Sequence, residues 1–435
     1  MKNILRAALA LSLALAACAK SADESTNVSA ANLASVSPAD KSAADQYARI
    51  EAVLQDEVDR GVRSGFVAMI ADERKVLHTT AVGLADIEAS TAMSAETRFR
   101  IASMTKPITT VALLMLVEEG RVLLNDPVAL YIPAFADMRV ATSPFKDETG
   151  AIPTEALARP VTIHHLLTHT AGLGYVFDNQ TDLGKAILER GVLANDGDLK
   201  SRIDVITEYP LYQQPGEKWQ YSFATDVAGR IVEIASGMSL EAFMDTNIFT
   251  PLKMADTEFF FDQSDFDRLA TVYTFDDEGA MIPFDGGGLS GSPNKNGTGW
   301  YSGGAGLVST AGDYVRFLQM LLNEGELEGA RIISPATVRL MLDSHVPAEA
   351  RPEEWRNGGL TFGLGGWVLE EPGLSGNMSA AGQFGWGGYY DTTFAISPQD
   401  RLAYVVLAQR EPGPNDKPSR AGDLVRSIAF GALEN

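Results

Sequence analysis

The sequence predicts a mixed α/β (α+β) fold in which an antiparallel sheet, assembled from both chain ends, is flanked by helices and joined to a mostly helical lobe. Apolar segments early in the chain predict strands over 65–71 and 75–82. Near the C-terminus, a strand is predicted to open at 384–390 and, after a turn, to return through 402–408. Helical patterns and loops dominate the middle of the chain, from about 107 to 299. We therefore expect a functional site, if the protein has one, to lie between the two lobes.

Residues 1–18 are typical of a lipoprotein signal peptide. Lys2 and Arg6 precede an apolar core, 7–15, that is too short to serve as a permanent membrane span. The core leads into Leu15-Ala16-Ala17-Cys18, which resembles the lipobox of bacterial lipoproteins, where the cysteine is joined to a diacylglycerol. Cys18 is also the only cysteine, so no disulfide can form within the chain. An ordinary secretory signal cleaved nearby is the alternative interpretation.

Residues 19–42 are rich in Ala, Ser and Asn and predict a flexible tether between the lipid anchor and the folded domain. We expect the domain, 43–435, to be exported and held on a membrane of the bacterial envelope, on the periplasmic side, by lipid on Cys18. A secreted or soluble periplasmic protein is the alternative. No motif indicates an oligomeric state.

Length and charge narrow the functional classes. The chain has 435 residues, and no long linker divides residues 43–435, so one catalytic unit with two lobes fits better than several domains. The net charge is −22, which becomes −24 when Lys2 and Arg6 leave with the signal peptide. This charge argues against nucleic acid as a partner and against docking on anionic lipid through charge. It also mildly favours neutral over anionic substrates.

Two terminal helices are predicted to cover the sheet, one over 44–62 and the other over 420–433. A third helix, over 107–119, carries the most informative motif at its head, and Gly120 supplies its C-terminal stop. The chemistry of the molecule is expected at this third helix.

Ser103-Met104-Thr105-Lys106 precedes that apolar helix. A spacing of three residues along a helix brings two side chains onto one face, about 5 to 6 Å apart at Cβ, so serine and lysine can share a proton. Proline is tolerated only in about the first helical turn, so Pro107 places Ser103 at the helix N-terminus. Free N–H groups and the helix dipole favour an oxyanion there. A helix cap with a solvated lysine is the alternative.

The Ser-x-x-Lys pattern occurs twice more, at Ser143-Pro144-Phe145-Lys146 and Ser292-Pro293-Asn294-Lys295. Both matches are followed by polar segments that contain glycine, so no helix would hold serine and lysine on one rigid face. We interpret both as loops.

Four later segments add to the Ser103 motif. Pro215-Gly216-Glu217-Lys218-Trp219-Gln220-Tyr221-Ser222-Phe223 leads into a helix predicted over 224–236, and Phe384-Gly385-Trp386-Gly387-Gly388-Tyr389-Tyr390 opens the strand that turns near 397–400. The other two are Leu166-Leu167-Thr168-His169-Thr170-Ala171-Gly172-Leu173 and the stretch 304–313. Taken in their order along the chain, these segments and the Ser103 motif resemble the serine β-lactamase and penicillin-binding protein superfamily. The likeness is closest to the class C β-lactamase-related branch, and within it to the family VIII carboxylesterases.

The resemblance implies a role for each matching residue. Ser103 would be the acylated nucleophile, Lys106 its neighbouring base, and Tyr221 the phenol that completes the proton relay. Tyrosine beside lysine titrates with it as one coupled unit, so either could take the serine proton. The backbone N–H groups of Ser103 and Tyr389 would form the oxyanion hole.

Departures from the β-lactamase pattern indicate the substrate class. Trp386, Gly387 and Gly388 occupy the place of a Lys-Thr-Gly strand motif, so the cation that would attract a β-lactam carboxylate is missing. Phe223 stands where those enzymes usually have asparagine. An aromatic pocket with these residues suits a short-chain neutral ester, and we expect a carboxylesterase. Asp391 lies where relatives commonly have glycine.

Two other classes of function stay open. One is a β-lactamase or a peptidase for D-amino-acid peptides, and the other is a non-catalytic penicillin-binding-like module. No cofactor or metal is expected. His165 and His169 are four residues apart but lack a glutamate base between them, so a structural pair is favoured over a zinc site. The glycine-rich run 286–306 lacks a Gly-Lys-Ser/Thr ending and is not expected to bind phosphate.

Overall fold

The computed structural model describes residues 43–192, 197–259, 267–284, 300–413 and 415–433. The predicted signal peptide with Cys18 and the predicted tether 19–42 lie outside the described residues. So do the Ser-x-x-Lys match at 292–295 and most of the glycine-rich run 286–306. No helix within the described ranges has the length and apolar character needed to cross a bilayer.

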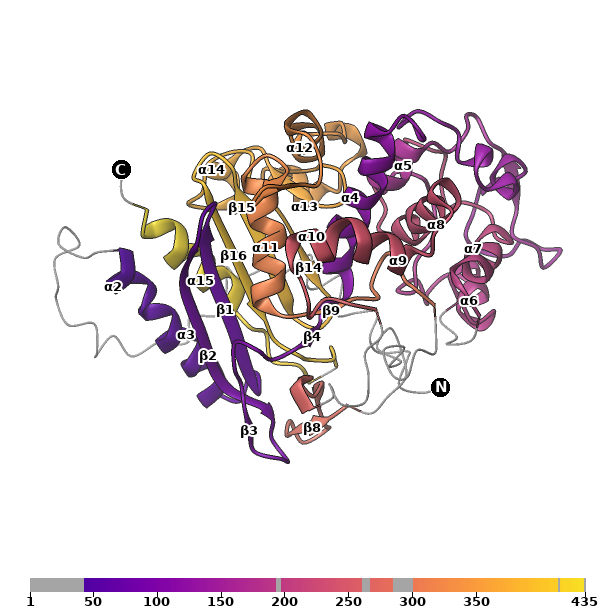
Figure 1. Cartoon of the computed structure of the whole chain (residues 1–435). Coiled ribbons are helices and arrows are strands. Elements are labelled where there is room, and N and C mark those ends of the chain that lie inside the picture. The colour runs from indigo at the N-terminus through magenta and orange to yellow at the C-terminus, as the bar shows by residue number, and fades with distance from the viewer. Residues whose placement is uncertain (1–42, 193–196, 260–266, 285–299, 414, 434–435) are drawn as a thin grey trace.

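One antiparallel sheet organises the larger lobe, which confirms the predicted fold class (Figure 1). Its strand order is β12-β13-β14-β15-β16-β1-β2-β3. The bounds of the strands are β1 Gly65–Asp72, β2 Val76–Asp86, β3 Thr91–Ala92, β12 Leu360–Phe362, β13 Trp367–Leu369, β14 Phe384–Gly388, β15 Thr392–Ser397 and β16 Leu402–Leu407. β1 pairs with β16, from Val67 opposite Leu407 to Asp72 opposite Leu402. The two chain ends therefore meet in the interior of this sheet.

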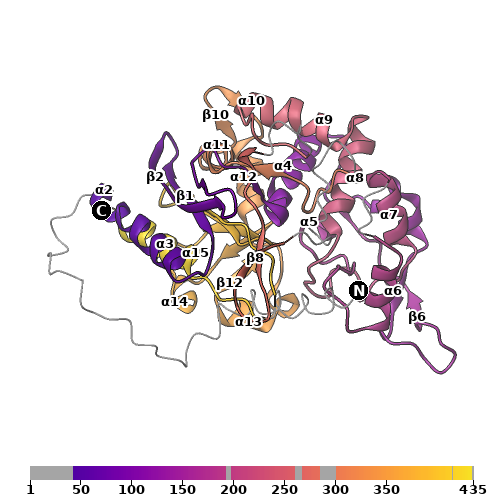
Figure 2. The same ribbon diagram turned by 90° about the horizontal axis from the view of Figure 1, so that it is seen from below.

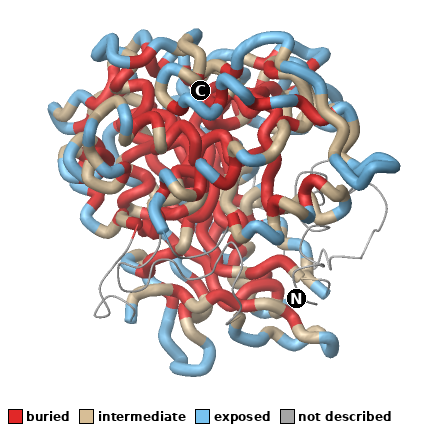
Figure 3. The backbone as a smooth tube through the Cα atoms, turned by 90° about the vertical axis from the view of Figure 1, so that its right-hand side faces the viewer, coloured by how far each residue is buried: buried red, intermediate tan, exposed pale blue. Residues whose placement is uncertain are grey.

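Strand β1 is buried on both faces because helices cover both sides of the sheet (Figure 2). Successive side chains of a strand point to opposite faces. Phe66 and Ile70 join one apolar cluster, while Val67 and Met69 join another. The first cluster is covered by α2 (Ala43–Tyr47), α3 (Arg49–Asp59) and α15 (Ala421–Gly431), and the second by α11 (Ala311–Leu322). Figure 3 shows the buried backbone concentrated in the middle of the molecule.

The predicted terminal helices are present with adjusted ends. The helix predicted over 44–62 is divided at Ala48, which keeps right-handed helical dihedral angles, so α2 and α3 run almost continuously. It ends at Asp59 because Gly61 adopts a φ of 63°, outside the right-handed helical region. The helix predicted over 420–433 is α15.

The second lobe is mainly helical. It is built on α4 (Thr105–Glu118), which ends in a Schellman motif: Gly120 N–H donates to Val117 O, and Arg121 N–H to Leu116 O. The other elements are β5 Arg139–Ala141, β6 Thr154–Ala156, α5 Ile163–Leu167, α6 Asp182–Glu189, α7 Leu199–Thr207, α8 Ala224–Ser236, α9 Leu240–Met244, a π-helical segment Asp245–Phe249 and α10 Thr250–Leu252. The boundaries of α8 match the prediction of 224–236.

Residues 267–284 depart from the expected helical lobe. They form β7 (Tyr273–Phe275) and β8 (Met281–Pro283), and Tyr273 bridges to Arg410 just beyond β16. The segment therefore belongs to the side of the sheet. The remaining elements are β4 Phe99–Arg100, β9 Val308–Ser309, β10 Glu326–Leu327, β11 Ala330–Arg331, α12 Pro335–Leu342, α13 Glu353–Asn357 and α14 Pro372–Ser375.

The prediction of one strand from 384 to a turn near 397–400 is wrong in one respect. The chain reverses earlier, so that β14 and β15 form a hairpin with Gly388 opposite Thr392. Asp391 makes this reversal with a φ of 66°, and its N–H donates to Gly388 O. Aspartate tolerates the left-handed region better than most residues, but glycine tolerates it best. The second turn, before β16, lies where it was predicted.

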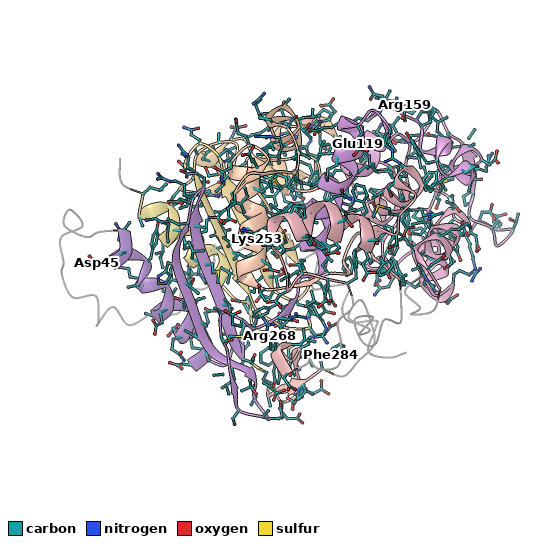
Figure 4. All side chains as sticks on the ribbon, viewed as in Figure 1. Asp45, Glu119, Arg159, Lys253, Arg268 and Phe284 are labelled. Carbon is teal, nitrogen blue, oxygen red and sulfur yellow. The ribbon has the colours of Figure 1, made fainter. Side chains whose placement is uncertain are left out.

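Charged side chains lie mostly outside the core. Asp45, Glu119 and Arg159, labelled in Figure 4, are all exposed. Arg63 is an exception: its side chain is 4% exposed, and its Nε lies 2.5 Å from Asp391 Oδ2.

We predict that Asp391→Gly destabilises the fold although glycine suits the left-handed turn better. Relief of strain is worth about 1 kcal/mol. Breaking a buried ion pair costs about 3 to 5 kcal/mol, and less here because Asp391 is 35% exposed. The expected net loss is about 1 to 2 kcal/mol in the free energy of unfolding, measured by urea denaturation. Asp391→Asn is the control, because it removes the charge alone. A variant more stable than the wild type would show that backbone strain outweighs the ion pair.

Candidate active site

Ser103 lies in a strained turn directly before α4. Ala102 has a φ of 43°, and residues Ala102–Met104 form one turn of 3-10 helix before α4 begins at Thr105. Pro107 is the third residue of α4, where the missing N–H costs no hydrogen bond because the first turn has none to make. The turn therefore presents Ser103 at the positive end of a buried helix.

The structure brings Ser103, Lys106 and Tyr221 together from two separate parts of the chain. Tyr221 Oη donates to Ser103 Oγ at 2.6 Å, and Lys106 Nζ donates to the same oxygen at 3.3 Å. Tyr221 comes from the segment that leads into α8, and α8 packs on α4. The serine hydroxyl thus has a phenol and an amine within direct proton-transfer distance.

Lys106 is fully buried. Its Nζ donates to Gly304 O at 2.8 Å and lies 4.5 Å from the centre of the Tyr221 ring. A buried cation is costly unless carbonyl oxygens, aromatic faces or counter-charges replace water. Lys106 has the first two of these in contact.

Tyr175 is a site residue that the sequence analysis missed. It stands 5.0 Å from Tyr221, ring centre to ring centre, in an edge-on arrangement, and its ring centre lies 5.4 Å from Lys106 Nζ. Burial raises the pKa of Tyr175 well above its usual value, and Tyr221 and Asp226 raise it further. Tyr175 is therefore a neutral phenol. Its place two residues after the 166–173 segment was the available signal.

The ring of His169 packs against the ring of Tyr221. It is fully buried, its ring centre lies 5.0 Å from that of Tyr221, and its Nδ1 is 3.1 Å from Ser222 Oγ. Burial, and then the nearby Lys106, lower the pKa of His169 well below its usual value, so the imidazole is neutral. His165 has a different partner, because its Nδ1 accepts from the Thr162 N–H. The two histidines do not converge.

No group of three or more His, Cys, Asp or Glu side chains in the described ranges is placed to hold a metal ion.

The end of β14 lies directly against the Ser103 turn. Thr392 Oγ1 donates to Ile101 O at 3.4 Å. A Cβ on Gly388 would stand 2.3 Å from Ile101 O and 2.2 Å from Thr392 Oγ1, so only glycine fits. This contact carries Tyr389, the next residue, to the vicinity of Ser103.

Aromatic side chains surround Tyr221. Trp386 is 6% exposed, and its ring centre lies 5.6 Å from that of Tyr221. Phe223 is 2% exposed and packs edge-on against Tyr175 at 4.7 Å. Gly387 lies between Trp386 and Gly388 in β14. The rings that complete the shell are Trp219, Trp355 and Phe362. Trp386 and Phe223 are therefore largely buried packing residues beside the triad.

The Ser-x-x-Lys match at 143–146 has no helix. Phe145 N–H donates to Ser143 Oγ in a local turn, which confirms the predicted loop.

Glu411 is the hydrogen-bond partner of the Tyr389 side chain. Tyr389 Oη donates to Glu411 Oε1 at 2.9 Å, and Glu411 Oε2 is buried with no partner among the described residues. Burial raises the pKa of Glu411 to about 7, against the opposing effects of Tyr389 and Arg410. A carboxyl group with a pKa of about 7 therefore accepts a hydrogen bond from Tyr389, a predicted residue of the site.

Comparisons with known proteins agree with this geometry. A family model described as β-lactamase matches residues 50–426. Esterase EstB of Burkholderia gladioli is 33% identical over 84% of this chain and 91% of its own length. The lovastatin esterase of Penicillium rubens is 36% identical over 58% of this chain and 60% of its own. The solved structure of EstCE1, a hydrolase with promiscuous acyltransferase activity, superposes with a TM-score of 0.74 at 28% identity, covering 89% of this chain and 99% of the other.

The raised pKa of Glu411 predicts a pH-dependent loss of stability. The folded state binds this proton more tightly than the unfolded state, so the free energy of unfolding falls as the pH rises from about 4.5 to about 7. Glu411→Gln removes this loss. At about pH 8 we expect the variant to be about 1 to 3 kcal/mol more stable than the wild type, and at about pH 4 no more stable, by urea denaturation.

Glu119→Gln, at an exposed position, is the matched control for removing a carboxyl group. An equal stability difference at both pH values in Glu411→Gln would contradict the assignment.

Proposed function

Because the chain belongs to the β-lactamase family of serine hydrolases, we propose that it is a carboxylesterase that forms an acyl-enzyme on Ser103. The observation that carries this proposal is the 2.6 Å hydrogen bond between Tyr221 Oη and Ser103 Oγ, with Lys106 Nζ 3.3 Å from the same oxygen. A free serine hydroxyl is a weak nucleophile and needs a base at this distance.

In the acylation step, Ser103 Oγ attacks the ester carbonyl carbon while its proton passes to the Tyr221 and Lys106 pair. The carbonyl oxygen becomes an oxyanion, which the N–H groups of Ser103 and Tyr389 stabilise. Collapse of this intermediate breaks the bond to the alcohol oxygen, and the same pair returns the proton to the departing alcohol. The acyl group then remains on Ser103.

In the second step water, or another alcohol, takes the place of the leaving alcohol. The pair accepts a proton from the attacking oxygen, and the acyl–Ser103 bond breaks to give the acid or a new ester. The pair then returns the proton to Ser103 Oγ, which restores the starting hydroxyl. Hydrolysis and acyl transfer share one intermediate, so they differ only in which nucleophile reaches it.

Short-chain neutral esters fit this environment best. The neighbours of the triad are mainly aromatic: Tyr175, Trp219, Phe223 and Trp386. Trp386 stands in place of the expected cation, and the net charge of −22 repels anionic substrates at long range. An apolar acyl group gains from these surfaces, whereas a carboxylate would lose its water without a partner.

A comparison of reagents tests this function. Wild-type protein and Ser103→Ala are treated with a p-nitrophenyl butyrate-type ester, a penicillin and a fluorophosphonate, and read by turnover and intact mass. We expect rapid ester turnover, a stable fluorophosphonate adduct and slow penicillin acylation in the wild type only.

Ser103→Ala should fold normally, as judged by circular dichroism, and lose at least about 10³-fold in turnover. Faster reaction with penicillin than with the ester would favour a β-lactamase or D-amino-acid peptidase. No adduct with any reagent would indicate a non-catalytic module. Retained ester turnover in Ser103→Ala would eliminate the proposed nucleophile.

We also propose that lipid on Cys18 tethers the enzyme to a membrane of the bacterial envelope. The support is the apolar segment that ends in Leu15-Ala16-Ala17-Cys18. Wild-type protein should sediment with membranes and dissolve only in detergent, whereas Cys18→Ser should not carry lipid by mass spectrometry. A wild-type protein that carries no lipid would contradict this proposal.

A further inference from the structure

A buried carboxylate, Asp226, lies one hydrogen-bonded step away from Lys106. It sits in the first turn of α8, five residues after Tyr221, and is 2% exposed. Its Oδ1 accepts from Ser302 Oγ at 2.7 Å and from Gly304 N–H at 3.0 Å. Gly304 O in turn accepts from Lys106 Nζ at 2.8 Å. One peptide unit on each side of Gly304 therefore connects the carboxylate to the amine.

The loop that makes this connection packs closely against both of its neighbouring helices. A Cβ on Gly304 would lie 2.7 Å from Asp226 Oδ2, and one on Gly303 would lie 2.8 Å from Thr225 O. Thr109 Oγ1 donates to Gly303 O at 2.7 Å, which joins the loop to α4. The loop is thus held between α8 and α4, the two helices that position the proposed triad.

Both donors to Asp226 point at the same oxygen, Oδ1. Burial raises the pKa of Asp226, while Lys106, Ser302 and Gly304 act in the opposite direction. The opposing effect of Lys106 is reciprocal, because a negative charge that gains from a nearby ammonium also stabilises that ammonium.

We propose that Asp226 is a positioning residue of the proposed esterase: it holds the Gly304 carbonyl against Lys106 and places a buried negative charge close to the lysine amine. The inference rests on the proposed function of Ser103. Asp226 does not touch the reacting atoms. It acts through Gly304 and through its charge.

The groups that bear on the charge of Lys106 come from several elements. They are the hydroxyl of Ser103 before α4, the phenols of Tyr175 and Tyr221, the neutral imidazole of His169 and the carboxylate of Asp226. Of these groups, Asp226 is the one carboxyl group, so it is the source of negative charge that Asp226→Asn removes. Its removal therefore has a predictable sign.

The first experiment compares the wild type, Asp226→Asn and Asp313→Asn in kcat and kcat/KM across pH. Asparagine keeps an oxygen acceptor for Ser302 and Gly304 but removes the charge. We expect kcat to fall about 10- to 100-fold with KM within about two-fold. The acidic limb of the pH profile should move to lower pH, because the lysine and tyrosine pair loses its proton more easily without the carboxylate.

Asp313 in α11 is the matched control. It is 9% exposed and accepts hydrogen bonds from Asp256 N–H at 2.7 Å and Thr257 Oγ1 at 3.0 Å, and burial also raises its pKa. Asp313→Asn should lower the melting temperature but leave the acidic limb where it is. A wild-type kcat and pH profile in Asp226→Asn would overturn the inference, and so would an equal shift of the limb in Asp313→Asn.

Ser302→Ala separates position from charge and serves if Asp226→Asn does not fold. It removes one donor to Asp226 and keeps the carboxylate. We expect kcat to fall by up to about 10-fold with the acidic limb unchanged. An unchanged kcat would overturn the positioning role.

One further readout needs no turnover and so distinguishes the two proposals. The NMR signal of the Lys106 side chain, followed against pH, should shift at a lower pH in Asp226→Asn than in the wild type. Wild-type protein that shows this difference but fails to react with any ester or fluorophosphonate would contradict the proposed function alone. A reactive wild type with no difference between the two signals would contradict the role of Asp226 alone.

Discussion

The burial of the Lys106 amine is the constraint on which the rest of the site depends. A lysine with no exposed surface loses its hydration, and the fold must replace that hydration with oriented oxygen atoms and aromatic faces. Ser103 Oγ, Gly304 O and the ring of Tyr221 provide them. Each of these groups is held by a different segment, so the segments have to converge before the lysine can be buried at low cost. The site therefore forms only when the two lobes pack together.

The convergence rests on rigid elements. α4 brings serine and lysine from the core of the helical lobe, α8 fixes the segment that carries Tyr221, and β14 brings Tyr389 from the sheet. Gly304 packs closely on Asp226 of α8, and Gly388 packs on Ile101 beside the Ser103 turn, so the loop and the strand are held against the site. A site assembled from helices and strands in this way keeps its geometry better than one assembled from loops.

The aromatic shell around Tyr221 has two effects. Trp219, Trp386 and Tyr175 pack around Tyr221 and make the surroundings of the proposed proton relay less polar, which strengthens the electrostatic interactions within it. The same rings make the surroundings suitable for an apolar acyl group and poor for a carboxylate. Family membership indicates serine hydrolase chemistry, and in the proposed function the residues at the place of the usual cation favour neutral esters.

The sequence alone determined the fold class, the family and the candidate nucleophile, because these depend on local patterns: a serine and a lysine three residues apart, a proline that marks the helix start, and ordered segments with turn chemistry. It could not place the hairpin turn at Asp391, since a left-handed aspartate resembles any other polar residue in a strand. It also missed the roles of Tyr175, His169 and Asp226, which are ordinary tyrosine, histidine and aspartate residues until the fold brings them beside Lys106. Only the tertiary structure decided which polar groups share that buried space, because the energy of a buried charge depends on its neighbours in three dimensions and not on its neighbours along the chain.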